Sequence, residues 1–134
     1  MVSYDTRELR ALAGSFRASS LLMYSQAEER LAVGGYQIEA RAKANIQANG
    51  SVQTGAMLNS VSTSTEGLTV EVGPTVEYGG YVEQGTDGPY PIPNAFGWGI
   101  TVMHPGNAPK PYLGPAFDAE IDGVVDSFLD LGDL

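Results

Sequence analysis

The sequence predicts an α+β domain in which a long N-terminal helical segment and a C-terminal helix pack on a small, mostly antiparallel sheet of three or four strands. Apolar residues recur at helical spacing before Gly50 and after Pro115, and short alternating segments lie between them. Most of the 17 glycines and 8 prolines also follow Gly50, so the back of the chain is rich in turns. A length of 134 residues suits one domain, and we expect residues 1–134 to fold as a single unit.

The front of the chain predicts helix in two stretches. Asp5 or Thr6 can cap a helix that begins at Arg7, because a short side-chain oxygen accepts from the free N–H groups of a first turn. Its apolar positions are Leu9, Leu12, Ala13 and Phe16. A second helical pattern covers about residues 26–47, contains Gly34-Gly35 and has one apolar stripe: Leu31, Ile38, Ala42 and Ile46. Each glycine costs a helix roughly 1 kcal/mol relative to alanine, so the pair predicts a kink, a break or close packing.

The centre of the chain predicts a short helical turn and a hairpin. Asn49-Gly50 is expected to end the long helix. Thr54 can cap a short turn with Leu58 pointing inward. Two extended segments should then pair around a turn at Glu66-Gly67, with the second segment alternating in burial. They are residues 61–65 and 68–72, with Leu68, Val70 and Val72 facing inward.

The back of the chain predicts a loop between two helical parts. Residues 76–84 are expected to form about a turn of helix, and residues 85–88 a turn. Three prolines from Pro89 to Pro93 predict an extended loop, before a strand over residues 98–103. Pro115 can open the last helix. Its apolar face should be Phe117, Ile121, Val124, Val125 and Phe128, and its outer face Asp118, Glu120, Asp122 and Asp126.

Composition excludes several classes of function. The chain has no cysteine, and we expect neither a secretion signal nor a membrane span, so synthesis in the cytoplasm is the default. The net charge of −9 is unevenly spread. Residues 1–43 hold six basic and five acidic side chains, whereas residues 44–134 hold Lys110 alone against eleven acids. Such a chain lacks a basic footprint for duplex DNA and would suit a protein that DNA passes without specific binding.

No pattern of residues predicts a catalytic, cofactor or metal site. His104, near Glu83 and Asp87 in the sequence, has neither a nucleophile motif nor a second histidine, so a turn residue is favoured over an acid–base catalyst. The glycine pairs match no phosphate-binding pattern. Asp118, Asp122 and Asp126 would stand about 6 Å apart on one helix face, which favours a solvated face, or contact with a basic patch of a neighbour, over a metal cage.

Two polar or aromatic segments are candidates for contacts between subunits. Gly85 is expected to form a left-handed turn that Thr86 fixes by bonding the backbone, while Glu83 either shares that local role or meets an arginine of an adjacent subunit. The loop 88–99 contains unusually many large apolar side chains: Tyr90, Ile92, Phe96 and Trp98. It either folds back over the sheet or reaches into a neighbour, and we favour the second for Trp98 or Phe96.

Three ordered segments resemble a known family. They are "QTGAMLNSV" at Thr54, Gly55 and Leu58, "YGGYVEQGT" from Tyr78 to Thr86, and "PKPYLGPA" from Pro109 to Ala116. Together, over about residues 25–131, they are similar to the phage morphogenesis family of tail-completion or head–tail joining proteins. The family often has a proline shortly before the TG pair, where this chain has Ser51-Val52-Gln53.

The resemblance implies a structural role without chemistry. The single domain would be head–tail connector-like and would form a hexameric or dodecameric ring at the virion's head–tail junction, as neck, tail-completion or tail-terminator protein. Its partners would be other copies and neighbouring neck or tail-tube proteins. The candidate interface residues are Glu83, Tyr90, Phe96, Trp98, Asp118, Asp122 and Asp126. The alternatives are a nonviral peptide- or ligand-binding module using loop 88–99 and a small hydrolase around His104.

Overall fold

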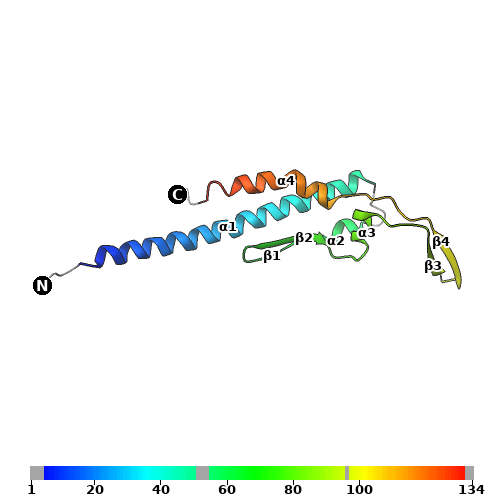
Figure 1. Cartoon of the computed structure of the whole chain (residues 1–134), viewed down its shortest axis with the longest axis horizontal. Helices are drawn as coiled ribbons and strands as arrows, with labels where there is room; N and C mark the ends of the chain where they lie inside the picture. Colours follow the sequence, from blue (N-terminus) through cyan, green and yellow to red (C-terminus); the bar gives the residue numbers. More distant parts are fainter. Residues whose placement is uncertain (1–4, 51–54, 96, 132–134) are drawn as a thin grey trace.

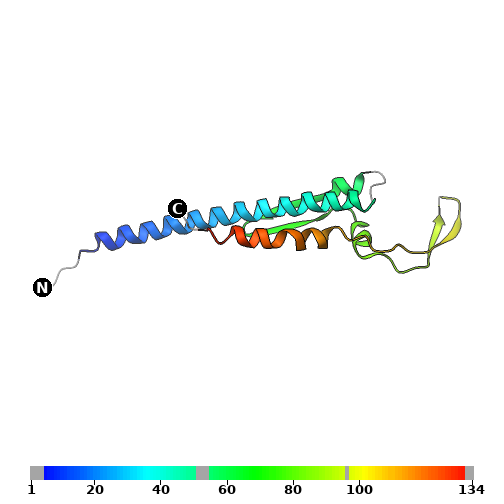
Figure 2. The ribbon, with the colours of Figure 1, turned by 90° about the horizontal axis from the view of Figure 1, so that it is seen from above.

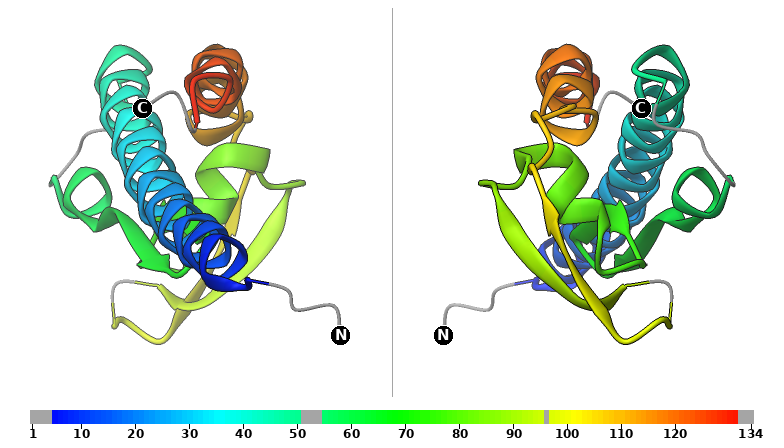
Figure 3. Two further views of the ribbon diagram at one scale, coloured as in Figure 1. Left: turned by 90° about the vertical axis from the view of Figure 1, so that its left-hand side faces the viewer. Right: turned by 90° about the vertical axis from the view of Figure 1, so that its right-hand side faces the viewer.

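The computed structural model describes residues 5–50, 55–95 and 97–131, and its elements are arranged along one long helix (Figure 1). This helix, α1 (Arg7–Ala48), has α4 (Leu113–Ser127) along one flank. The antiparallel ribbon of β1 (Val61–Glu66) and β2 (Thr69–Pro74) lies along another. Viewed along the long axis, α4 lies beside α1, with the strands below (Figure 3). The predicted α+β class is confirmed.

Helix α1 is continuous over 42 residues, where the sequence suggested two helical stretches. At its start the backbone N–H of Arg7 donates to the Asp5 carboxylate at 2.9 Å, whereas the Thr6 side chain makes no capping bond. It ends as predicted: the N–H of Asn49 donates to the Asn45 carbonyl, and Gly50 takes a positive φ of 66°.

The Gly34-Gly35 pair allows close packing on two sides of α1, which is one of the three predicted outcomes. A Cβ atom on Gly34 would lie 2.7 Å from Val124 Cγ2 of α4. A Cβ atom on Gly35 would lie 2.7 Å from Thr63 Cγ2 of β1 and would also clash with Val70 of β2. Two adjacent residues therefore let the helix approach two different neighbours.

The first ribbon forms as predicted except at its turn. Val61 pairs with Pro74 and Glu66 with Thr69, so the turn is Gly67-Leu68. Leu68 is 50 % exposed, and its predicted inward orientation is wrong, because it lies in the turn and outside the ladder. Val70 and Val72 are half-buried against α1.

The proline-rich segment is not the predicted loop but a strand, β3 (Tyr90–Ala95), paired with β4 (Ile100–His104). Prolines 91 and 93 are compatible with it because each strand of a two-stranded ribbon has a free edge, where a missing N–H costs no ladder bond. The expected single sheet of three or four strands is therefore wrong, since the four strands form two separate ribbons. The β3–β4 ribbon projects from the far end of the molecule (Figure 2).

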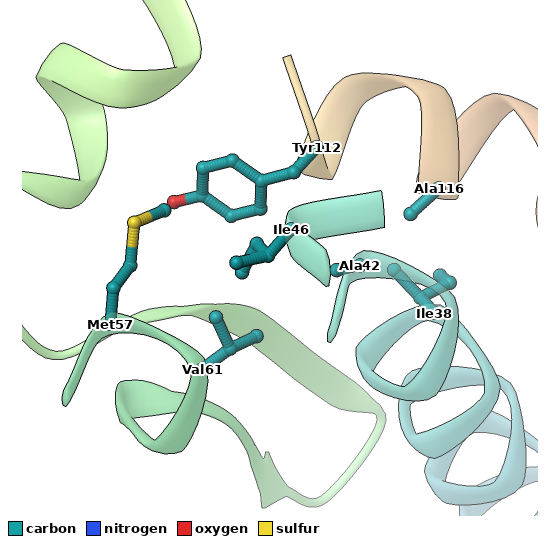
Figure 4. Packing of buried hydrophobic residues seen from close by; sticks show 7 residues of the cluster. All are labelled: Ile38, Ala42, Ile46, Met57, Val61, Tyr112 and Ala116. Carbon is teal, nitrogen blue, oxygen red and sulfur yellow. The ribbon is translucent and has the colours of Figure 1, made fainter. Parts of the chain in front are cut away.

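A small core joins α1, α4 and the short helix α2 (Ala56–Ser60) (Figure 4). The ring of Tyr112, 1 % exposed, is the largest fully buried side chain and points its hydroxyl toward Met57. Leu58, predicted to point inward, packs partly buried against this core. Thr54, its expected cap, lies outside the described residues. The buried apolar set is Ile38, Ala42, Ile46, Met57, Val61, Tyr112, Ala116 and Val124.

Helix α4 begins at Leu113, two residues before the predicted start at Pro115. Arg41 of α1 pairs with Glu120, so the prediction that Glu120 lies on the outer face is wrong. Arg30 also donates to the carbonyl of Ser127. The predicted apolar face is only partly covered, because Val124 is buried while Phe117 and Val125 remain exposed.

The first part of α1 is exposed along its length among the described residues, and at its end the Tyr24 hydroxyl lies beside Gly67 in the turn of the first ribbon. We call residues 7–25 the arm; all of them are exposed, and they extend beyond α4 and the first ribbon (Figures 1 and 2). Phe16 and Leu21 are 67 % and 74 % exposed. Neither the arm nor any other described helix is long and apolar enough to cross a membrane.

Replacing Gly35 with alanine should destabilise the fold although alanine favours helix. The gain of roughly 1 kcal/mol in helix propensity is outweighed by overpacking against Thr63 and Val70, which typically costs about 1–3 kcal/mol or more. Gly123→Ala is the matched control, because a Cβ there has no neighbour within 4 Å and should stabilise α4. Urea unfolding measures both variants, and an equal gain in both would contradict close packing at Gly35.

Candidate functional site

Glu83, at the end of α3 (Gly79–Gln84), accepts three hydrogen bonds from the start of α4. Its Oε2 accepts from the backbone N–H groups of Tyr112 and Leu113 at 2.7 and 2.9 Å, and its Oε1 accepts from Gly114 at 2.9 Å. The first N–H groups of a helix have no partner within the helix, and a negative charge there is favoured by the helix dipole. Glu83 is therefore a cap supplied from another element.

The chain around Glu83 is fastened to the segment before α4 by backbone bonds. The N–H of Lys110 donates to the carbonyl of Val82, and the N–H of Thr86 donates to the carbonyl of Asn107, both at 2.9 Å. The Asn107 N–H in turn donates to the Thr86 hydroxyl oxygen, so the predicted role of Thr86 in fixing the backbone is confirmed. Gly85 has the predicted positive φ, 75°, and a Cβ there would meet the Pro109 nitrogen at 2.7 Å.

Two asparagines at the end of α1 hold the same segment from the other side. The side-chain amides of Asn45 and Asn49 donate to the carbonyls of Tyr112 and Pro111, at 3.0 and 2.9 Å. Hydrogen bonds to its backbone groups thus hold the segment from Asn107 to Leu113 between α1 and α3. Hydrogen bonds therefore join the segments "YVEQGT" and "PKPYLGPA", which are far apart in the sequence.

Tyr112 is buried where these elements meet. Its hydroxyl donates to the carbonyl of Gly79 at 3.1 Å, and a Cβ on Gly79 would lie 3.2 Å from that hydroxyl oxygen. Burial, and to a lesser extent the charge of Glu83, raises the pKa of Tyr112 from its ordinary 10.0 to about 12. The phenol is a neutral structural donor at every physiological pH.

An apolar groove of about 440 Å³ opens between α4 and β2, with α1 as its floor. Because α4 and β2 do not meet over α1, apolar side chains that would otherwise form a core are left lining an open groove. Glu83 and Gly114, which a hydrogen bond joins, also border the groove. The rest of the lining is Leu31, Gly34, Gly35 and Ile38 of α1, Val70 and Val72 of β2, and Leu113, Phe117, Ile121 and Val124 of α4.

The predicted interface residues fall on two separate surfaces. Asp118, Asp122 and Asp126 are all exposed on α4, and no cluster of three acidic or histidine side chains in the described part of the chain could hold a metal ion. Trp98, 74 % exposed, lies in the turn of the β3–β4 ribbon, which projects away from α4 (Figure 1). Of the two alternatives for this segment, its described residues do not adopt the one in which it folds back over the sheet.

Less can be said of three other candidate residues, Tyr90, Phe96 and His104. Tyr90 and His104 pair by backbone at the base of the projecting ribbon, while Phe96 lies outside the described residues. The carboxylate of Glu83 is occupied within the chain, and its contact with a neighbour's arginine stays a prediction.

Sequence reasoning left the role of Glu83 open and did not find the groove. One signal for the cap was present: Tyr112, at the N-cap of α4, has no oxygen able to cap locally, so an acceptor must come from elsewhere. The groove had no such signal, because its lining comes from three elements whose relative positions are set only in the fold.

Replacing Glu83 with alanine should destabilise the protein by about 1–3 kcal/mol. Three N–H groups, two of them partly buried, would lose their acceptor. Glu83→Gln should give a smaller loss because it keeps one acceptor oxygen. Glu77→Ala, which removes an exposed acid from the turn before α3, should have little effect in the same urea titration. Similar losses in Glu77→Ala and Glu83→Ala would rule out the cap.

The raised pKa of Tyr112 should make stability fall in alkali. Between pH 10 and about 12 the unfolded tyrosine has lost its proton while the folded one keeps it, so the free energy of unfolding falls as pH rises. One such proton corresponds to about 1.4 kcal/mol per pH unit. Tyr112→Phe should be less stable at pH 8 but lose less over this range, as measured by urea unfolding. Parallel curves for the two proteins would contradict the assignment.

Comparison with known proteins supports the family suggested by the motifs. Residues 24–85 match the family model described as "Bacteriophage HK97-gp10, putative tail-component". We found no match among curated proteins or solved structures. The matched range includes most of α1, the first ribbon and Glu83, and stops before the segment that Glu83 caps. The resemblance suggested by the motifs is thereby confirmed over residues 24–85, which are similar to the HK97-gp10-like family of putative phage tail components.

Proposed function

We propose that the protein is a structural ring subunit at the head–tail junction of a phage virion, as a neck, tail-completion or tail-terminator protein. The match of residues 24–85 to a phage tail-component family carries this proposal. The shape of the chain supports it: the arm and the β3–β4 ribbon extend from opposite ends of a small body (Figures 1 and 2). Large exposed apolar surfaces of this kind are usually covered by partners.

The projecting ribbon is the surface we propose for contact with a neighbouring neck or tail-tube protein. Trp98, Ile100, Val102 and Met103 are exposed on it. Exposed aromatic side chains on rigid supports are typical anchors of interfaces. Tyr90 and Phe96, from the same segment, complete the proposed contact as sequence-based candidates.

The acidic face of α4 is proposed either to meet a basic patch of a neighbour or to face the channel. Asp118, Asp122 and Asp126 are exposed side chains. If they line a channel, repulsion between them and phosphate lets DNA pass without binding. The subunit would act by shape and charge, with no catalytic step, and would be hexameric or dodecameric in the virion.

The proposal is tested by imaging the purified protein and measuring its mass. We expect closed rings in negative-stain images, alone or on virion tails, with a native mass of six or twelve chains. Trp98→Ala should weaken attachment to tails without changing the unfolding midpoint, because that side chain is 74 % exposed.

His104→Ala is the control, since assembly without chemistry should survive this change. A monomer that binds neither itself nor tails would contradict the ring. Binding of peptides through the ribbon by such a monomer would support the nonviral binding module. Loss of an enzymatic activity in His104→Ala would support the hydrolase.

A further inference from the structure

We infer that the arm of one copy packs into the groove of the next copy, so that each subunit donates one helix and receives another. This inference rests on the proposed ring and names the surfaces that would build it. Four observations carry it: the apolar stripe of the arm, the geometry of α1, the length of the groove, and the charges beside both.

The arm presents an apolar stripe with no cover. Leu9, Leu12, Phe16 and Met23 recur at spacings of three, four and seven residues, which places them on one face of a helix. Their exposed fractions range from 42 % to 67 %. Helices in proteins take most of their stability from packing of an apolar face, so this exposed stripe points to a partner surface.

The arm cannot occupy the groove of its own chain. Residues Leu31, Gly34, Gly35 and Ile38 of the same continuous helix form the floor of that groove, and the arm runs on from them away from the body. Folding back would require breaking α1. The helix that fills the groove must therefore come from a different molecule.

The stripe and the groove match in length. From Leu9 to Met23 the helix rises about 21 Å. The apolar wall of α4 from Leu113 to Val124 extends about 17 Å along that helix. A helix laid along this wall would cover Phe117, which is 48 % exposed in the isolated chain.

Charge distinguishes the arm from the other apolar candidate. Arg10 and Arg17 are exposed on the arm, while Asp118 and Asp122 are exposed on α4 beside the groove residues Phe117 and Ile121. Opposite charges around an apolar contact favour that pairing and fix its register. The β3–β4 ribbon is also apolar, but residues 88–104 contain neither lysine nor arginine to meet these acids.

The contact would be head to tail. Arm and groove are different surfaces, so every copy offers one of each, and a repeated contact of this kind closes into a ring when the rotation between copies permits. Two arms paired with each other would instead give a dimer and leave both grooves open.

The absence of cysteine from the chain allows a direct crosslinking test. The double variant Phe16→Cys with Phe117→Cys, treated with a short flexible bismaleimide, should give a ladder of covalent oligomers ending at the ring size. Phe16→Cys alone should give no dimer. Phe16→Cys with Ala119→Cys, an exposed position two residues further along α4, is the matched control and should give no ladder.

Each other result would overturn the inference. Dimers of Phe16→Cys alone mean that arms pair with each other, and a ladder from Trp98→Cys with Phe117→Cys in its place means that the ribbon fills the groove. Rings in negative stain without the expected ladder overturn the arm–groove contact and leave the ring proposal standing. A chain that stays monomeric at every concentration overturns both.

Charge reversal in the full chain gives a second readout. Arg10→Glu with Arg17→Glu should raise the concentration for half-assembly at least about tenfold, while the unfolding midpoint stays unchanged because both side chains are exposed. Adding Asp118→Arg and Asp122→Arg should restore assembly. Loss of assembly without rescue would place those acids away from the contact.

Discussion

The hydrogen bonds from the start of α4 to Glu83 are the constraint on which the rest of the body depends. A carboxylate that accepts three N–H groups fixes the position and direction of the helix that follows. The same bonds hold Tyr112 at the N-cap, where its ring enters the core and its hydroxyl reaches the Gly79 carbonyl. One polar contact thus sets the placement of α3, of the segment 107–112 and of the largest fully buried side chain.

The second constraint is that α4 and the first ribbon both pack on the same helix, α1. Gly34 and Gly35 let α4 and the first ribbon approach α1 on two sides, but neither flank reaches the other. The core is consequently small, and two of its eight buried apolar residues in the described chain are alanines. A small core buries little surface, and binding to a folded partner adds to stability by mass action. The open groove and the modest core have the same cause.

The parts of the fold that depend on local periodicity could be predicted from sequence. Burial of one face gives the apolar residues of a helix or strand a regular spacing. This spacing predicted α1 from the stripe of Leu31, Ile38, Ala42 and Ile46, and the first ribbon from the alternation around Val70. The strand at Pro91 was missed because edge strands obey weaker rules than central ones. The role of Glu83 was left open and Glu120 was wrongly placed on the outer face, because each meets its partner across more than 28 residues. Contacts between residues so far apart in sequence depend on the topology of the fold, which local sequence patterns do not predict.

The uneven charge of the sequence takes on a structural meaning once the elements are placed. The basic residues lie almost entirely on α1, while the acids of the back half lie on the ribbons, α3 and α4. In a head-to-tail ring this division makes unlike ends attract and like ends repel, so charge excludes arm-to-arm pairing that apolar contact alone would allow. The apolar stripe would supply the affinity of the contact, and the charges would determine which surfaces pair. Attraction of this kind requires an acidic body and a basic arm, and residues 7–25 hold three arginines against one glutamate.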